Sequence, residues 1–243
     1  MGFRDAALGR LSGHAESMKG MMILSVSQGR QRTATKSRVA GEQRWEEIVE
    51  AAAKIFSQKG YEATSLQDIA NTVGILKGSM YYYFKNKEDL LFELVQRALD
   101  AHQPSLVEEP EIAEAAAPVR LRAFIRRWMA LNRKQRLWRG VAESEFGRLR
   151  GKRLKEVIAE RDKFSAFAKE IIEQGMRDGD FDSGVDPSVV TSTLFELMNT
   201  TQTWFKPSGR LSYAELADWY ATFFIRGLGG SDELVAKSSG ETG

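Results

Sequence analysis

The 243-residue sequence predicts an all-α protein. Apolar residues recur at helical spacing through most of the chain from Trp45 onward, and no segment alternates apolar and polar residues for long enough to predict a strand. Hydrophobic residues make up 42% of the sequence, which suffices for a buried core in a chain of this length. Cysteine is absent, so disulfides, thiolate metal sites and cysteine nucleophiles are excluded.

Residues 1–41 lack a sustained helical period and are predicted to form a disordered, basic N-terminal extension. Between Met18 and Gly41 there are five basic residues and no acidic ones. Two interpretations stay open. The segment is either a solvated leader, for which Met18, Met21 and Met22 are alternative start positions, or a basic arm that contacts nucleic acid.

The first helix is predicted to begin at Glu42. Its apolar face follows the i, i+3, i+4, i+7 pattern and consists of Trp45, Ile48, Val49, Ala52, Ile55 and Phe56. Gly60 is expected to end this helix, because glycine adopts the left-handed conformation that often follows a helical C-terminus.

Two short helices follow, with a glycine between them. Ser65 and Asp68 resemble a capping box with a shorter acid, which places the start of the first short helix after Ser65. Gly74 is expected to end that helix in a sharp turn. The second short helix is predicted over residues 77–84, and Asn86 is expected to cap a fourth helix.

Short helices joined by a glycine turn predict a helix-turn-helix, which places its second helix in the major groove of DNA. That helix begins with Lys77-Gly78-Ser79, which offers a cation, a bare backbone and a hydroxyl to base edges. The following tyrosines, 81 to 83, span about 200° of a helix, so they cannot all face the core with Met80 and Phe84. Their hydroxyl groups can instead donate to phosphates.

The remainder of the chain is also predicted to be helical. Further helices are expected over residues 118–131, 137–149, 154–177, 187–205 and 212–228. The last two carry broader apolar stripes than one protomer needs, which predicts a four-helix bundle between two copies. The predicted domains are an extension (1–41), a helix-turn-helix domain (42–88), a ligand-binding and dimerisation domain (89–229) and a flexible tail (230–243).

The motif resembles a known family in the order and spacing of its residues. The matching blocks are Phe56-Ser57-Gln58-Lys59-Gly60-Tyr61, Thr64-Ser65-Leu66-Gln67-Asp68-Ile69-Ala70 and Val73-Gly74 through Leu91. They are similar to the DNA-binding domain of the TetR/AcrR family of transcriptional regulators. The resemblance implies an all-helical homodimer with an N-terminal DNA-binding domain and a larger ligand-binding domain, usually a repressor of operator DNA released by a small hydrophobic molecule.

The family pattern also implies which residues contact DNA. They are Ser65, Gln67, Lys77, Gly78, Ser79, Tyr81, Tyr82, Tyr83 and Lys87. Many relatives have histidine where this chain has Tyr83, but both side chains can donate to a phosphate.

The C-terminal half shows a second resemblance. Residues 161–181 and 198–212 are similar to family members that respond to acyl-CoA thioesters. This implies an acyl pocket between the middle helices, with basic residues at its mouth for the CoA phosphates. The candidate lining residues are Trp128, Phe164, Phe167, Met198, Thr201 and Trp204. The alternative is a drug-responsive repressor of an efflux pump.

The charge balance supports two unlike parts. Residues 30–87 contain ten Lys and Arg against six Asp and Glu, a net of +4, whereas the whole chain has a net charge of +2. The positive excess therefore lies at the DNA-facing end.

Other classes of protein are disfavoured. An enzyme is not expected, because the sequence has no glycine-rich phosphate loop and Glu143 and Glu145 diverge on a helix. Only two histidines, His14 and His102, are present, which makes a histidine metal site improbable, and no cofactor is expected. No apolar run reaches the roughly 18 residues of a membrane span, so the expected location is cytoplasmic.

Overall fold

The computed structural model describes residues 24–107, 109–134, 136–206 and 208–230. Within these ranges the chain forms ten α-helices and two short 3₁₀ helices and contains no β-strand, which confirms the all-α prediction. The chain divides into two units, Met1–Trp45 and Glu46–Gly243. None of the helices in the described ranges is both long and apolar enough to cross a membrane.

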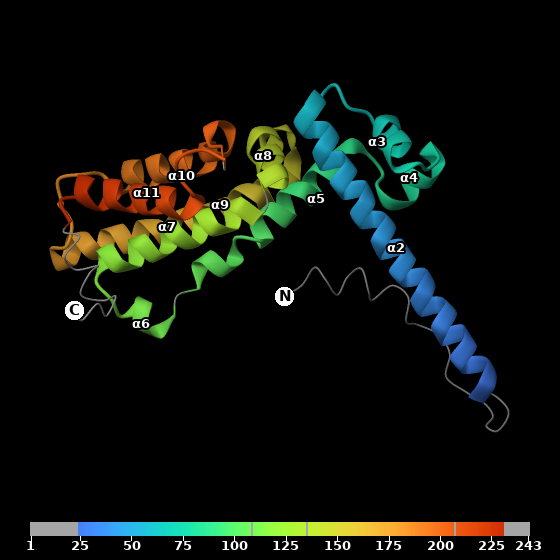
Figure 1. Ribbon diagram of the computed structural model, residues 1–243, viewed down its shortest axis with the longest axis horizontal. Coiled ribbons are helices and arrows are strands. Elements are labelled where there is room, and N and C mark those ends of the chain that lie inside the picture. Colours follow the sequence, from blue (N-terminus) through green and yellow to red (C-terminus); the bar gives the residue numbers. More distant parts are fainter. Residues whose placement is uncertain (1–23, 108, 135, 207, 231–243) are drawn as a thin grey trace. The chain divides into compact units, whose positions relative to one another are not determined.

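Figure 1 shows the order of the helices along the chain. They are α2 (Leu24–Lys59), α3 (Leu66–Val73), α4 (Lys77–Tyr83), α5 (Lys87–Asp100), η1 (Gln103–Leu106), α6 (Pro110–Ala113), α7 (Ala117–Lys134), α8 (Arg136–Glu145), η2 (Phe146–Arg148), α9 (Gly151–Asp178), α10 (Pro187–Trp204) and α11 (Tyr213–Gly227).

The start of α2 differs from the sequence prediction. The helix begins at Leu24, whereas the apolar period placed its start at Glu42. Residues 24–41 contain no proline, which would interrupt a helix, but they also lack an apolar stripe that a periodicity argument could detect. The predicted disorder of residues 1–23 and of the tail beyond residue 230 lies outside the described residues.

The helix-turn-helix is built as its caps predict. The Ser65 hydroxyl accepts from the backbone N–H of Asp68 at 3.2 Å, and the Asp68 carboxylate accepts from the backbone N–H of Ser65 at 2.8 Å. Gly74 ends α3 with φ of 74°, in the left-handed region where a side chain would be strained. Asn86 caps α5 through a second capping box with Asp89, so these three boundary predictions are confirmed.

A compact apolar core holds α3 and α4 against the C-terminal part of α2. Ile48, Ala52 and Phe56 of α2 are buried, as are Leu66, Ile69 and Ala70 of α3 and Met80 of α4. Met80 has no exposed surface, so it fixes the orientation of α4 about its own axis. The opposite side of α4 is consequently directed away from the core.

The C-terminal helices form a bundle. Figure 1 shows α7, α9, α10 and α11 lying side by side, and α7 packs against α11, α9 and α10. The predicted first-turn proline of α10 and the predicted start of α11 are confirmed: Pro187 follows the cap residue Asp186, and Ser212 caps α11 through Glu215. The short elements η1 and α6 have too few residues to show a period and were not predicted, whereas η2 lies inside the helix predicted over residues 137–149, which continues past Glu145 as a 3₁₀ turn.

Candidate nucleic-acid interface

The exposed side of α4 carries the residues that the sequence singled out for DNA contact. Lys77, Gly78 and Ser79 are exposed at its start. Tyr82 is 87% exposed and Tyr81 is 49% exposed, whereas Tyr83 is less exposed than either. The Tyr83 ring packs edge-on against the Tyr82 ring, with 5.2 Å between their centroids. The structure therefore brings the cation, the hydroxyl and two tyrosines together on one short, well-anchored helix.

The residues of α3 are placed differently. The Ser65 hydroxyl donates to the Asp68 carboxylate at 2.7 Å, so its only proton is used within the cap. Hydrogen bonds from the Ser65 side chain and backbone lower the pKa of Asp68, which keeps this cap ionised. Gln67 is partly exposed and its amide donates to Asn71 at 2.7 Å. Ser65 thus has a structural task, while Gln67 presents its amide at the surface.

Lys87 also has a partner within the protein. Its ammonium group donates to the carbonyl oxygens of Tyr61 at 2.7 Å and Glu62 at 3.2 Å, and it lies 4.2 Å from the centre of the Tyr61 ring. These contacts tie the start of α5 to the loop between α2 and α3. An ammonium group has three donors, so one remains for a phosphate.

Sequence reasoning assigned no role to Leu76, which is 80% exposed beside the start of α4. Its spacing of four residues from Met80 suggests a core position in a continuous helix. Leu76 is instead the cap residue, with extended backbone angles of φ −68° and ψ 146°, so helical spacing does not apply to it. An exposed leucine at this position can contact a thymine methyl group.

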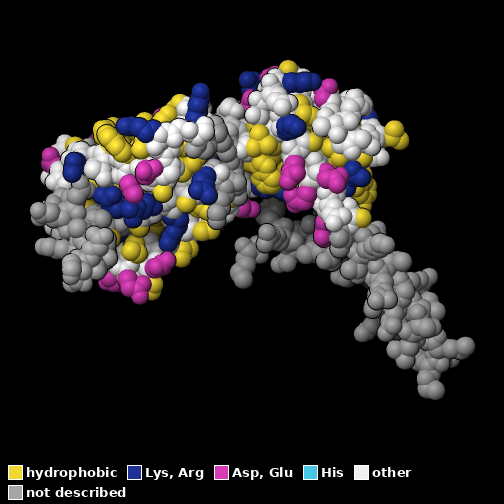
Figure 2. Space-filling view, in the orientation of Figure 1, with side chains coloured by type: hydrophobic (Ala, Val, Ile, Leu, Met, Phe, Trp, Pro, Cys, Tyr) yellow, Lys and Arg dark blue, Asp and Glu magenta, His cyan; other side chains and the backbone are white. Residues whose placement is uncertain are grey.

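Charge alone does not mark the interface. On the face drawn in Figure 2, Lys and Arg side chains are interspersed with Asp and Glu side chains. Two basic residues beyond the helix-turn-helix pair with acids in or next to it: Arg148 lies 2.8 Å from Glu62, and Arg153 lies 2.5 Å from Asp89 of α5. The identity and exposure of the α4 residues are therefore better evidence than the net charge.

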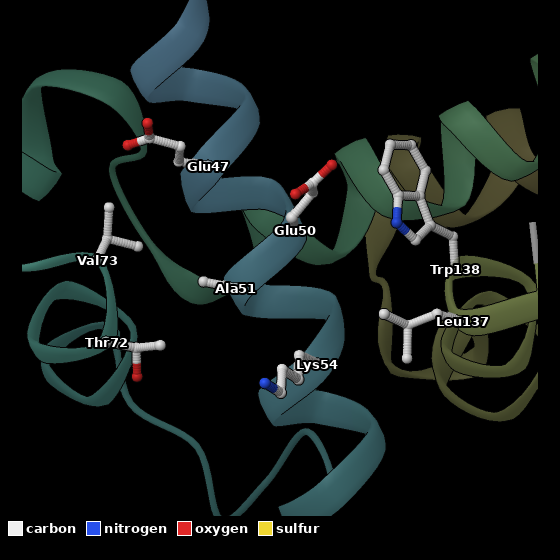
Figure 3. Close-up of a pocket in the computed structure, with 8 residues that line it drawn as sticks. All are labelled: Glu47, Glu50, Ala51, Lys54, Thr72, Val73, Leu137 and Trp138. Carbon is white, nitrogen blue, oxygen red and sulfur yellow. The ribbon is translucent and has the colours of Figure 1, made fainter.

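A cleft of about 580 Å³ lies beside the helix-turn-helix. Figure 3 shows Leu137 and Trp138 of α8 on one side of α2, and Thr72 and Val73 of α3 on the other. The Arg97 guanidinium lies 4.8 Å from the centre of the Trp138 ring.

Arg97 connects this cleft to α2. Its guanidinium forms ion pairs with Glu46 at 2.5 Å and with Glu93 at 2.8 Å. The hydrogen bond from Arg97 lowers the pKa of Glu46, so this pair stays charged at neutral pH. Arg97 therefore contacts Trp138, which lines the cleft, and Glu46 of α2.

The candidate ligand-lining residues do not all come together. Trp128 and Phe164 are buried and lie 5.3 Å apart between ring centroids, and Phe167 lies in the same aromatic group. Met198 is buried nearby, since its carbonyl accepts from Asn132 of α7. The Thr201 hydroxyl is hydrogen-bonded to Tyr220, and Trp204 is 54% exposed. Trp204 lies at the surface, apart from this aromatic group.

Comparison with known proteins assigns both halves of the chain. The model described as bacterial regulatory proteins of the tetR family matches residues 48–94. The model described as the tetracyclin repressor-like C-terminal domain matches residues 114–228.

Individual relatives match over most of their length. The transcriptional repressor KstR2 of Mycobacterium tuberculosis is 27% identical over 198 residues, which are 79% of this chain and 96% of that protein. The TetR family transcriptional regulator PfmR from Thermus thermophilus is 30% identical, with a TM-score of 0.63, over 74% of this chain and 98% of that one. The structure of AibR in complex with isovaleryl coenzyme A and operator DNA is 28% identical, with a TM-score of 0.65, over 74% of this chain and 97% of that one.

Proposed function

Because the chain belongs to the TetR family of DNA-binding transcriptional repressors, we propose that it acts as a cytoplasmic homodimer that releases its operator when it binds a small hydrophobic ligand, an acyl-CoA thioester. The family consists of regulators and not of enzymes. The observation that carries the proposal is the exposed face of α4, which lies inside the residues matched by the DNA-binding family model.

The proposed DNA contacts are divided by chemistry. Lys77, Gly78 and Ser79 face base edges at the start of α4, and the exposed Leu76 adds an apolar contact. The tyrosine hydroxyls and Lys87 contact phosphates, which position the helix without reading sequence. Among the tyrosines, Tyr82 is the strongest candidate because its side chain is the most exposed.

Two variants test this assignment, Lys77→Ala and Tyr82→Ala. Both side chains are exposed, so neither change removes core packing, and the far-UV helical signal should be unchanged. We expect each to weaken binding to a labelled duplex, selected from random DNA by the wild-type protein, by at least about fivefold in fluorescence anisotropy. Lys155→Ala, an exposed lysine of α9, is the matched control and should bind normally. Normal binding by both test variants would contradict the assignment.

The proposed dimer uses α10 and α11. A groove of about 840 Å³ runs along α11, lined by Leu211, Glu215, Asp218, Trp219, Thr222, Phe223, Arg226 and Gly227. Trp219 and Phe223 are each more than half exposed on this face, which is unusual for large apolar side chains on a monomer. A second copy of the same face would cover them, because a two-fold interface pairs a surface with itself.

Phe223→Glu should therefore convert the dimer to a monomer in analytical ultracentrifugation, since it places charge in an apolar interface. Val107→Glu changes an apolar residue that is also exposed but lies after η1, and it should leave the dimer intact. A dimer should also require a pseudo-palindromic operator with half-sites about 34–36 Å apart or a multiple of that spacing. A Phe223→Glu variant that remains dimeric would assign the interface elsewhere.

Support for the effector class comes from a relative. AibR was crystallised with isovaleryl coenzyme A and operator DNA, and its likeness to this chain extends over both halves. The aromatic group of Phe124, Trp128, Phe164, Phe167 and Phe195 offers this chain an apolar environment for an acyl group.

A thermal-shift screen separates this proposal from a drug-responsive repressor of an efflux pump. A ligand at about 100 times its Kd stabilises the folded protein by about 2.7 kcal/mol, which is a readily measured shift. An acyl-CoA sensor should respond to acyl-CoAs of some chain length and not to cationic drugs. The opposite pattern would favour the efflux alternative.

A further inference from the structure

The bundle contains a cluster of buried polar side chains that no part of the proposed function has used. We call it the polar core cluster: His102, Trp128, Asn132, Arg139 and Asn199. They come from the segment after α5, from α7, from α8 and from α10, and each is at most 7% exposed.

Hydrogen bonding satisfies only part of this cluster. Arg139 donates to the Asn199 side chain at 2.6 Å, and the Asn132 amide donates to the Met198 carbonyl at 3.1 Å. Among the described residues, no hydrogen bond of ordinary geometry is found for either ring nitrogen of His102, for Trp128 Nε1, for Asn132 Oδ1 or for Arg139 Nε, although the Asn132 side chain lies close enough to His102 to interact with it. Buried polar atoms without partners are rare in native proteins because each carries an unrecovered desolvation cost, so several at one place require an explanation.

These atoms lie around one ring. The His102 and Trp128 rings are 4.0 Å apart between centroids, and the Arg139 guanidinium lies 5.1 Å from the centre of the Trp128 ring. Asn132 is one helical turn from Trp128 on the same face of α7. A single small group placed beside Trp128 can therefore contact several of them together.

The charge of the cluster is positive. Glu143 is the carboxylate near Arg139, but both of its oxygens accept from Arg161 at 2.9 Å. Two arginines thus share one carboxylate. Burial lowers the pKa of Arg139 to about 10, which still leaves it charged at neutral pH. Burial, together with repulsion from the charged Arg139, lowers the pKa of His102 to about 2. The interaction with the Asn132 side chain acts in the opposite direction but does not outweigh burial, so His102 is neutral.

The available groups define what fits. Arg139 Nε, Trp128 Nε1 and one nitrogen of neutral His102 are donors, whereas Asn132 Oδ1 and the other His102 nitrogen are acceptors. Donors outnumber acceptors, and the excess charge favours oxygen with negative or partial negative charge. The rings of Phe124, Phe164 and Phe195 surround Trp128 and are suited to a hydrocarbon chain.

We infer that the polar core cluster binds the acyl oxygen of the effector, a thioester carbonyl or a carboxylate, while the surrounding aromatic rings hold its hydrocarbon chain. The inference rests on the proposed function, because it assigns the polar part of the same effector site. A purely structural role would predict that these polar groups pair with one another, whereas several donors of the cluster lack a well-formed hydrogen bond among the described residues.

The test uses three probes of equal chain length, octanoyl-CoA, octanoate and 1-octanol, measured by calorimetry on the full chain. In octanoyl-CoA the acyl oxygen belongs to a thioester, and in octanoate it belongs to a free acid. The probe that binds more tightly identifies which of the two groups the cluster recognises. Octanol lacks the acyl oxygen and should bind at least about tenfold more weakly than the better acyl probe.

Two variants remove cluster groups, and a third is the control. His102→Phe keeps the stacked ring and removes both unpaired nitrogens, so it should be as stable as wild type or more stable, yet bind the acyl probe at least about tenfold more weakly. Arg139→Met should also bind the acyl probe at least about tenfold more weakly than wild type. Tyr213→Phe removes another buried oxygen without a partner among the described residues, away from the cluster, and should bind normally.

The combination of retained stability and lost affinity in His102→Phe is the supporting result. The inference is overturned if His102→Phe and Arg139→Met bind the acyl probe normally, if octanol binds as well as the acyl probes, or if no acyl probe binds wild type. Operator binding by the same preparation is measured in parallel. If it is intact, the proposed repressor function stands even where the acyl assignment fails.

Discussion

The neutral, buried state of His102 makes the stability of this protein depend on pH in a way that one substitution should remove. His102 has no exposed surface, and burial followed by repulsion from Arg139 lowers its pKa from 6.5 to about 2. In the unfolded chain its pKa returns to about 6.5, so below that pH the unfolded state binds a proton that the folded state rejects. The stabilising effect of the neutral ring is complete above pH 6.5 and is lost as the pH falls toward 2.

The size of this effect follows from linkage. Each pH unit below 6.5 lowers the free energy of unfolding by about 1.4 kcal/mol. Integration from pH 7.5 to pH 5.0 gives a total decrease of about 2 kcal/mol. This figure does not depend on the exact folded pKa, provided that it stays below about 4. His102→Phe keeps the ring against Trp128 and removes the proton site, so this contribution disappears.

Urea denaturation of wild type and His102→Phe at pH 7.5 and pH 5.0, at one fixed protein concentration, measures the difference. Between pH 7.5 and pH 5.0, the free energy of unfolding of the wild type should fall by about 2 kcal/mol more than that of the variant. All other acids and His14 are present in both proteins, so their contributions cancel. Equal losses would show that His102 is accessible to protons in the folded state and would refute the reasoning.

Three further predictions concern packing, capping and DNA. Gly175→Ala should lower the free energy of unfolding by about 1–3 kcal/mol, because its new methyl group would lie 2.3 Å from Phe181 and 2.7 Å from Ala117. The control is Gly140→Ala, whose methyl group would have nothing within 4 Å, and a thermal melt should show it to be neutral or stabilising. Ser65→Ala should cost about 1 kcal/mol in urea denaturation through loss of the α3 cap, and a loss near zero would mean that Asp68 holds the turn alone. Operator affinity should fall as a straight line on a double-logarithmic plot against salt concentration, with no such dependence expected if charge plays no part.

Local chemistry explains what the sequence could predict. Caps and turns depend on a few neighbouring residues, so Ser65, Gly74, Asn86 and Ser212 could be assigned to their roles from sequence alone. The start of α2 could not, because no apolar stripe marks residues 24–41. The domain boundaries and the site residues remain predictions.

The two candidate sites differ in the same way: one is formed by neighbouring residues of the sequence, and the other is formed only by the packing of helices. The α4 residues are contiguous, so one short motif presents them together. The polar core cluster joins residues from positions 102 to 199, and only the packing of the bundle brings them to one ring. The sequence named Trp128 as a candidate lining residue and gave His102 no role in this site, since nothing local shows which groups surround its ring nitrogens.

Consecutive residues of α8 face different surroundings. Trp138 lines the cleft beside α2 and lies against Arg97, whereas Arg139 is buried in the polar core cluster. Neighbouring side chains of a helix diverge by about 100°, so any rotation or shift of α8 moves both. If displacement of α8 by a ligand changes operator affinity, operator DNA changes the affinity for that ligand by the same factor. A ligand that binds equally well to both positions of α8 would not shift operator affinity through this helix.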